Sequence, residues 1–429
     1  MARVYRSIEQ SWEILFDKYD IVSKVQKDGL FRISSAQINT VKEARLMAKF
    51  DQSVQLPGIF KENQLFILPV ARGEYIIGSF SVYSTITYSD IRPRPVAIPH
   101  LESIDYTNLY SEASALLFAY NSGIIHDIMG AEQVNFTVNG RMSSGTFDFN
   151  INDYSDPSLT HKILVQNAQL EIDAGYESEK AFCICEAKNI VAEEVLIRQL
   201  YYPYRLWKSK ISKPVIPVFL VYSNDIFHAF IYQFEDDNHY NSLKLLEHKA
   251  YTFADDEVSL SEVINIWKGI KPISEPNITF PQANSFVRIV DLLSLLYERE
   301  LTRDEVTSQY GFDSRQTNYY VSACEYLDLI KRTNTSEGYR IYELTDEART
   351  IMGSKFKDKY LALIKKILER PVFYKAFGLA INAGQLPGNQ EICKIMMESN
   401  LDINQKTICR RSSTVSGWID WILKQCVME

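Results

Sequence analysis

The residues best suited to chemistry are two carboxylates and a lysine near the end of a short apolar run. The stretch 182–188 is Phe-Cys-Ile-Cys-Glu-Ala-Lys, and its pattern predicts a buried strand that ends in Glu186 and Lys188. Because the side chains of a strand alternate between its faces, these two point to the same side. An antiparallel pairing with the preceding strand brings Asp173 close to Glu186. Converging carboxylates bind a hard cation such as Mg²⁺, and a lysine beside them orients or activates water and offsets charge on a phosphate.

Several alternatives to this assignment remain open from the sequence. Glu171 shares a strand face with Asp173, so either carboxylate is a candidate for the first metal ligand. Glu186 and Lys188 could instead form a cross-strand salt bridge with a structural role only. The same Glu-x-Lys spacing recurs at 247–249, where polar surroundings indicate a solvated surface. Glu112 is a weaker candidate ligand, because its helix could direct it at the metal or leave it on the surface.

The elements that must hold these residues lie in a second region of the chain, residues 100–257. Helical spacing predicts a helix over 110–120, which places Glu112 near the first turn. Strands are expected over 134–138 and 146–151, paired as a hairpin around Asn139-Gly140 or Ser143-Ser144-Gly145. Further strands are expected over 164–174, 181–188, 215–222 and 227–234, with a helix over 191–207. The chain is therefore expected to be a multidomain protein of the α+β or α/β class.

Residues 1–95 are expected to form a first α+β domain. The stretch Arg92-Pro93-Arg94-Pro95 can continue neither a helix nor a central strand, which indicates a boundary. Helical spacing covers 8–16 and 36–50, and strand-like runs cover 64–70 and 75–86. Lys42, Arg45 and Lys49 fall on one face of the second helix. This stripe is either a surface that contacts phosphates, in a domain that helps to recognise DNA, or an ordinary solvated surface.

The last third of the chain is almost purely helical, after an expected linker over 258–284. Helices over 286–300, 302–310 and 313–329, followed by two short strands around Ser336-Glu337-Gly338, predict a winged helix-turn-helix over 285–352. Thr302 and Glu305 have the spacing of a capping box, and Asp313 can cap the third helix. Helices over 372–382, 390–400 and 413–424 predict a second helical unit of the same kind over 353–429. Its Trp418 and Trp421 are expected to be core residues.

The start of the third helix in the winged unit is predicted to read DNA. Arginine suits guanine, and glutamine or asparagine suits adenine, in the major groove; the residues concerned are Arg315, Gln316, Asn318 and Tyr319. An ordinary polar or protein-binding helix face is the alternative. Phosphate contacts are predicted in two further places, within the acid-free stretch 198–213 and at an expected helix N-terminus after residue 409. Their residues are Lys208 and Lys210 in the first, and Arg410, Arg411 and Ser413 in the second.

The composition sets limits on the class of protein. The 429 residues include 46 Lys and Arg against 54 Asp and Glu, so any nucleic-acid contact must lie in local patches. No apolar run approaches the length of a membrane helix and no signal peptide is evident, so a cytoplasmic protein without membrane contact is expected. The six cysteines form neither a CxxC pair nor a Cys/His cluster, which argues against zinc and against a secreted disulfide framework.

The order of these elements resembles a known family. The helix with Glu112, the strand with Asp173, the Glu186-Ala187-Lys188 strand, the following helix and the apolar strand 215–222 resemble the PD-(D/E)xK nuclease core of restriction endonucleases. Ile172 stands where proline usually precedes the first Asp. Gln199, Tyr202 and Tyr204 resemble the Gln/Tyr helix of some relatives, and residues 43–73 look like the leading domain of a group of type II restriction enzymes.

This resemblance implies a mixed sheet flanked by helices and a specific activity. The expected reaction is Mg²⁺-dependent cleavage of double-stranded DNA at a defined sequence, in a restriction-modification system, with 5′-phosphate ends. Since one active site cuts one strand, a homodimer is expected at least transiently. Two kinds of alternative remain: a modification-dependent or transposon-associated nuclease with the same core, and a non-catalytic winged-helix regulator that binds DNA.

Overall fold

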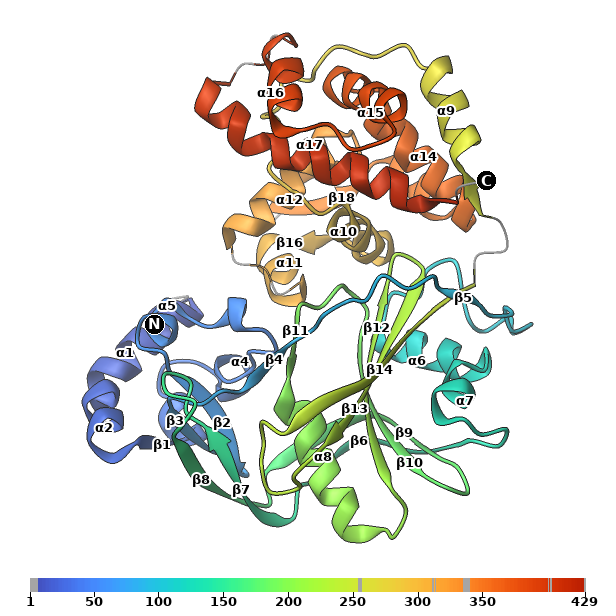
Figure 1. Ribbon diagram of the computed structural model, residues 1–429. Coiled ribbons are helices and arrows are strands. Elements are labelled where there is room, and N and C mark those ends of the chain that lie inside the picture. The colour runs from blue at the N-terminus through green and yellow to red at the C-terminus, as the bar shows by residue number, and fades with distance from the viewer. Residues whose placement is uncertain are drawn as a thin grey trace.

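The computed structural model describes residues 7–253, 257–310, 312, 314–334, 340–399, 401 and 403–427. The chain is mixed α and β, which confirms the expected class. Figure 1 shows an N-terminal part beside a large central sheet, with a helical C-terminal part above both. No helix among the described residues is both long enough and apolar enough to cross a membrane.

The N-terminal part is built on a five-stranded sheet with the order β1-β3-β2-β8-β7. Its own strands are β1 (Leu30–Ser34), β2 (Phe66–Ala71) and β3 (Glu74–Gly78). The helices around it are α1 (Ile8–Tyr19), α2 (Ile21–Asp28), α3 (Ser35–Ile38), α4 (Ala44–Met47), η1 (Ser53–Gln55) and α5 (Gly58–Glu62). The single helix expected over 36–50 is therefore wrong, because α3 and α4 are two separate turns.

The sheet is completed by strands from beyond the expected boundary at residue 95. These are β7 (Thr146–Asn152) and β8 (Thr160–Gln166), which pair with each other. Their alternate apolar residues, such as Phe149 and Val165, are buried in the same core as the N-terminal residues. The first structural unit thus consists of two separate stretches of chain.

The predicted hairpin between 134–138 and 146–151 is wrong. The strand β6 (Asn135–Ser143) pairs with β9 (Gln169–Glu177) in the central sheet, whereas β7 belongs to the N-terminal sheet. Gly140 has a φ of 89° inside β6, at a shift in its pairing register, and does not form a hairpin turn. The expected strand 164–174 is likewise broken at Asn167, where the chain returns from one sheet to the other.

The central sheet has seven strands in the order β5-β14-β13-β12-β10-β9-β6. The new members are β5 (Arg94–Pro95), β10 (Phe182–Lys188), β12 (Val215–Ser223), β13 (Ile226–Phe234) and β14 (Leu243–Thr252). The strand β10 is antiparallel to β9 and parallel to β12. A parallel connection needs a crossover, and α8 (Ile197–Lys210) supplies it. The expected start of this helix at residue 191 is wrong, since β11 (Glu194–Leu196) comes first and pairs with β4 (Tyr83–Thr85).

The two faces of the central sheet belong to two separate cores. Cys183, Cys185 and Ala187 pack on the side of α6 (Glu112–Asn121) and α7 (Ile124–Met129), while Phe182 and Ile184 pack on the side of α8. Figure 1 shows these helices on opposite sides of the sheet. The predicted alternation along β10 is thus confirmed. Glu186 contacts Gln199 of α8, and the side chain of Lys188 meets that of Glu186 at the end of the strand.

The C-terminal part begins with three helices and a three-stranded sheet. The elements are α10 (Phe286–Glu298), β16 (Leu301–Thr302), α11 (Arg303–Tyr310), α12 (Ser314–Tyr326), β17 (Ile330–Asn334) and β18 (Arg340–Leu344), with the strand order β16-β18-β17. The predicted capping box is confirmed, because Thr302 N donates to Glu305 Oε2 and Glu305 N donates to Thr302 Oγ1. Asp313 and the turn 336–338 lie outside the described residues.

The remaining helices share one core with α10, α11 and α12. They are α13 (Asp346–Met352), α14 (Phe356–Leu368), α15 (Pro371–Ala383), α16 (Asn389–Met397) and α17 (Gln405–Gln425). The prediction that Trp418 and Trp421 are core residues is confirmed. Among the described residues of this unit the only strand is β19 (Cys426–Val427), which pairs with β15 (Val258–Ser259), so they show no hairpin within the unit.

The expected linker over 258–284 is wrong in its first half. Residues 260–269 form α9 (Leu260–Gly269), which begins with a capping box between Ser259 and Glu262. Trp267 of this helix packs on Tyr374 and Phe377 of α15. This segment therefore belongs to the C-terminal core.

Candidate active site

The end of β10 brings Glu186 and Lys188 into direct contact. Lys188 Nζ lies 2.7 Å from Glu186 Oε1, and the two side chains are only 15% and 8% exposed. Asp173 comes from the neighbouring strand, since the antiparallel ladder pairs Cys185 with Ala174 and ends there. Beyond that point Asp173 Oδ2 accepts a hydrogen bond of 2.9 Å from Ala187 N. The three residues predicted from the sequence thus meet at one place.

Two further helices direct side chains to the same place. Glu112 is the first residue of α6, and its Oε1 lies 3.4 Å from Lys188 Nζ. Gln199, in the first turn of α8, donates a hydrogen bond from Nε2 to Glu186 Oε1. The Oε1 atom of Gln199 is buried without a hydrogen-bond partner. Glu112 was the weaker expectation, and Gln199 was suggested only by the family resemblance.

The structure distinguishes Asp173 from Glu171. Glu171 is exposed and forms an ion pair of 3.4 Å with Arg141 of β6. Asp173 instead contacts the backbone between Glu186 and Lys188. Of the two carboxylates, Asp173 is therefore the member of this cluster.

The cluster holds more negative charge than its one ammonium group balances. Burial, together with the carboxylates of Asp173 and Glu112, raises the pKa of Glu186 to about 8 against the lowering effect of Lys188. Burial also raises the pKa of Glu112. Burial lowers the pKa of Lys188, but the carboxylates of Glu186, Glu112, Asp51 and Asp173 outweigh it, so the net pKa is well above its ordinary value. A site of this kind attracts cations and keeps its lysine charged.

The donor chemistry of the cluster suits a hard divalent cation, which prefers carboxylate oxygens. Within the described part of the chain, however, no group of three or more His, Cys, Asp or Glu side chains is arranged to hold a metal ion. Lys188 now bridges Glu186 and Glu112, and the unpartnered oxygen of Gln199 is a further polar atom beside them. The side chains thus have the chemistry that such an ion prefers, but they are not arranged in a coordination geometry around one.

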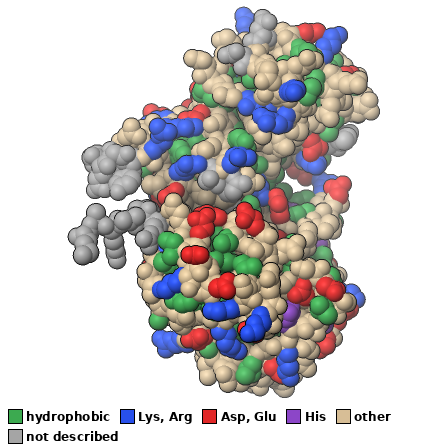
Figure 2. All heavy atoms as spheres, turned by 90° about the vertical axis from the view of Figure 1, so that its left-hand side faces the viewer, with side chains coloured by type: hydrophobic (Ala, Val, Ile, Leu, Met, Phe, Trp, Pro, Cys, Tyr) green, Lys and Arg blue, Asp and Glu red, His purple; other side chains and the backbone are tan. Residues whose placement is uncertain are grey.

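A cleft of about 930 Å³ opens at this cluster, between all three parts of the molecule. Glu112, Lys188 and Asn189 lie in it on the central part. The N-terminal part contributes Lys42, Arg45, Lys49, Asp51 and Gln55, among others, and the C-terminal part contributes mainly α10, α11 and the loop between them. Figure 2 shows the molecule from the side of the N-terminal part, with lysines and arginines both above and below a group of acidic side chains. The predicted basic residues of the first domain therefore share a cleft with Lys188 and Glu112.

The sequence offered no signal for Asp51. This residue follows α4, and its charge acts on both Glu112 and Lys188. It faces them only because the N-terminal part packs against the central sheet. Such a contribution across domains leaves no pattern in a single sequence.

The predicted base-reading residues lie on α12, outside the part of the C-terminal region that lines this cleft. Arg315 and Asn318 are exposed, and Gln316 and Tyr319 are half-buried. The cleft is lined instead by Thr307, Ser308 and Gln309 at the end of α11, among others.

Arg410, Arg411 and Ser413 do not begin a helix, so that prediction is wrong. They lie in the second and third turns of α17, which starts at Gln405 with Asn404 as its cap. Arg411 is buried and donates from Nη1 to the backbone oxygen of Phe280, and Ser413 Oγ lies 3.2 Å from Asn284 Oδ1. Arg411 therefore stabilises the helical core, while Arg410 is exposed.

Lys208 and Lys210 lie at the opposite end of β10 from the cluster. They end α8, shortly before Val215, which pairs with Phe182 at the start of β10. Phe182 and Lys188 are six residue steps apart along the strand, or ~20 Å at the usual rise. Lys208 pairs with Asp237, and the Lys210 ammonium lies over the ring of Trp207. Lys208 and Lys210 are therefore far from the cluster, although the stretch 198–213 begins beside it with Gln199.

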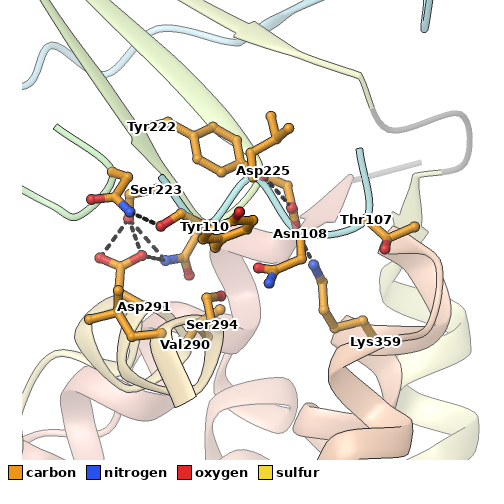
Figure 3. Close-up of a pocket in the computed structure, with 14 residues that line it drawn as sticks. Thr107, Asn108, Tyr110, Tyr222, Ser223, Asp225, Val290, Asp291, Ser294 and Lys359 are labelled. Carbon is orange, nitrogen blue, oxygen red and sulfur yellow. Dashed lines mark hydrogen bonds and ion pairs between the residues drawn. The ribbon is translucent and has the colours of Figure 1, made fainter. Parts of the chain in front are cut away.

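A small polar pocket joins the C-terminal part to the chain that follows Lys188 (Figure 3). Asp291 of α10 accepts hydrogen bonds from Val191 N at 2.9 Å and from Ser223 Oγ at 2.8 Å. Lys359 of α14 forms an almost fully buried ion pair of 2.6 Å with Asp225. Since Val191 is three residues from Lys188, these contacts connect α10 to the chain at the end of β10.

Comparison with protein families gives three matches, none of which covers half of the chain. Residues 9–77 match a domain of unknown function (DUF6996), residues 78–252 match another (DUF6997), and residues 288–427 match a third (DUF7226). No curated protein and no solved structure matches the chain. The chain is therefore similar to three successive domains whose function is not described.

Proposed function

We propose that this protein is a magnesium-dependent endonuclease that cleaves double-stranded DNA. The observation that carries the proposal is the buried pair of Glu186 and Lys188, with Asp173 from the adjacent strand and Glu112 from α6. Of these residues, Lys188 and Glu112 line the cleft. The order α6, β9, β10, α8, β12, in which β10 is antiparallel to β9 and parallel to β12, supports a PD-(D/E)xK core.

In this proposal Asp173, Glu186 and Glu112 would hold Mg²⁺, and the bound ion would lower the pKa of a water molecule and stabilise charge on the phosphate. Lys188 orients the attacking water and donates to a phosphate oxygen as negative charge develops there. Gln199 keeps the Glu186 carboxylate in place through its hydrogen bond. The strong preference of Lys188 for its charged form favours its role as a hydrogen-bond donor, not as the base.

The finer proposal is a type II restriction enzyme of a restriction-modification system, which leaves 5′-phosphate ends. The order of α10, β16, α11, α12, β17 and β18, with its three-stranded sheet, supports a winged helix-turn-helix. Its α12 exposes Arg315 and Asn318, which suits the reading of base edges. A second active site for the other strand comes from another copy of the chain, at least transiently.

The test is incubation of the pure protein with plasmid and phage DNA, with Mg²⁺ or with EDTA. We expect discrete fragments with Mg²⁺ only, and none from a Lys188→Ala variant. A smear would support a nonspecific nuclease, and cleavage confined to methylated DNA would support a modification-dependent one. Intact DNA that is merely retarded would contradict the proposal and support a winged-helix regulator. A Glu247→Ala variant is the matched control, because residues 247–249 have the same Glu-x-Lys spacing on β14.

A further inference from the structure

We propose that the N-terminal part forms one wall of the cleft, and that this wall binds the phosphates of the DNA strand being cut. The residues concerned are Lys42, Arg45 and Lys49. This inference rests on the proposed nuclease function. It adds that the N-terminal part of the chain contacts the cut DNA strand, and that it does so in the cleft.

The three basic residues lie in the same cleft as Glu112 and Lys188, although they do not share one helix. Arg45 is in the short helix α4, and Lys42 and Lys49 are on either side of it. A phosphate that reaches Lys188 is therefore next to the N-terminal wall. Cations spaced along such a wall are suited to the phosphates that flank the one under attack.

The opposite wall is less suited to phosphates. Its charged residues are Glu298, Arg299 and Asp304, and Arg299 is paired with Glu305 at 2.8 Å. The rest of its polar surface consists of neutral side chains, including Thr307 and Gln309. The N-terminal wall has three basic residues in the cleft against one acidic residue, Asp51, so the two walls differ in net charge. This difference favours the backbone of the cut strand on the N-terminal side.

Arg45 and Lys49 can exchange their present contacts for phosphate at little cost. Arg45 Nε pairs with Glu43 at 2.6 Å, and Lys49 Nζ lies 3.9 Å from Asp51. Both basic side chains are more than 70% exposed, and ion pairs this exposed contribute little to stability. A phosphate oxygen offers both of them a stronger, charge-assisted partner.

The wall is held in a defined place relative to the catalytic strand. Ser53 donates from its backbone N and its Oγ to the carboxylate of Glu194, which is six residues from Lys188. Across the cleft, Gln55 Nε2 lies 3.3 Å from the backbone oxygen of Ser308 in α11. The wall therefore contacts both the catalytic part and the C-terminal part, so its distance from Lys188 is set by several contacts.

The experiment compares two double variants, Arg45→Ala/Lys49→Ala in the cleft and Lys208→Ala/Lys210→Ala at the far end of β10. Each removes two positive charges, and thermal unfolding checks that both are folded. Binding to a duplex is titrated at several salt concentrations in a Lys188→Ala background. The same titration of proteins with intact Lys188 in EDTA avoids dependence on that background. Lys42→Ala is added singly.

We expect the cleft variant to bind every duplex sequence at least about tenfold more weakly. Its slope of log affinity against log salt should fall by about 0.9 for each lost contact, because fewer counterions are released. The far variant should match the parent protein. Equal behaviour of the two double variants, or an unchanged slope in the cleft variant, would overturn the proposal.

A cleavage assay separates this inference from the proposed function. Suppose that the protein with intact Lys188 cleaves DNA with Mg²⁺ and that the cleft variant binds and cleaves DNA equally well. Phosphate binding by the N-terminal wall is then refuted, and the proposed nuclease activity is retained. Suppose instead that the protein with intact Lys188 does not cleave DNA, and that of the two double variants only the cleft variant loses DNA affinity and has a smaller salt slope. The N-terminal wall then binds DNA, and the proposed nuclease activity is refuted.

Discussion

Lys188 Nζ contacts Glu186 of its own strand at 2.7 Å and Glu112 of α6 at 3.4 Å. One ammonium group therefore joins two carboxylates that are 74 residues apart in sequence. All three side chains are held by regular elements, and a cleft opens beside them. An isolated salt bridge would need none of the further polar groups, Asp173 and Gln199, that meet here. This convergence favours a catalytic role over a purely structural one.

Asp173→Asn should reduce the rate of Mg²⁺-dependent cleavage by about 10²-fold or more, because it removes a charge from the proposed metal site. Specific DNA binding should remain. Glu171→Gln is the matched control on the same strand, since Glu171 is exposed and pairs with Arg141. Single-turnover cleavage of a duplex measures both variants. Equal rates for the two would exclude Asp173 from the mechanism.

Arg315→Ala and Gln316→Ala should each weaken the discrimination between specific and scrambled duplexes by ~1–3 kcal/mol, if α12 reads base edges. Nonspecific affinity should change much less. The measurement is a pair of binding titrations in EDTA, with Lys394→Ala of α16 as an exposed control that also removes a positive charge. An unchanged ratio of affinities would mean that α12 does not read the sequence.

Protonation of His228 should destabilise the fold in mild acid. Burial, with a contribution from His248, lowers the pKa of His228 from 6.5 to about 3. Between these two pH values the unfolded chain therefore binds a proton at His228 that the folded chain does not bind. The folding stability that the neutral histidine allows above pH 6.5 is lost as the pH falls toward 3. At pH 5 the loss is about 2 kcal/mol.

A His228→Gln variant should lack this part of the loss between pH 7 and pH 5. Urea unfolding at the two pH values measures it, with a variant of the exposed His100 as the control. If the His228 variant loses as much stability as the parent protein, the histidine is not buried in its neutral form.

Mild oxidation should join Cys393 of α16 to Cys409 of α17. Their sulfur atoms lie 3.7 Å apart, and a disulfide needs ~2.05 Å. Burial raises the pKa of the Cys393 thiol, so the exposed Cys409 should react first. Diamide takes up the two protons and two electrons that the thiols release. Thiol titration after denaturation should show the loss of two of the six thiols, and Cys409→Ser should lose none. Loss of thiols in that variant would mean that other cysteines react, and it would contradict the assignment of the disulfide to Cys393 and Cys409.

The parts of the site that depend on local pattern could be predicted from the sequence. Alternation along 182–188 correctly placed Glu186 and Lys188 on one face, and the helix spacing placed Glu112 near the first turn of α6. The Thr302 and Glu305 capping box is also local, and it is present. Each of these features depends on residues a few positions apart, for which periodicity is a reliable guide.

The parts that depend on distant contacts could not be predicted. The strands β7 and β8 join the N-terminal sheet because Phe149 and Val165 fit its core, and nothing in their alternation distinguishes that sheet from the central one. Arginine usually lies on the surface, yet Arg411 is buried and donates a hydrogen bond to the backbone oxygen of Phe280. Asp51 and the basic residues of the N-terminal wall reach the cleft only because the N-terminal part packs against the central sheet.

The central claim, that Glu186 and Lys188 support the hydrolysis of DNA with Mg²⁺, is tested most directly by single-turnover cleavage with a Glu186→Gln variant. The substitution keeps the size of the side chain and removes its charge and one of its two oxygen atoms, and Glu247→Gln is the matched control. We predict that the parent protein and Glu247→Gln cleave a duplex with Mg²⁺ and not with EDTA, and that Glu186→Gln is slower by about 10²-fold or more. Cleavage by Glu186→Gln at the parent rate, or no cleavage by the parent protein, would contradict the account.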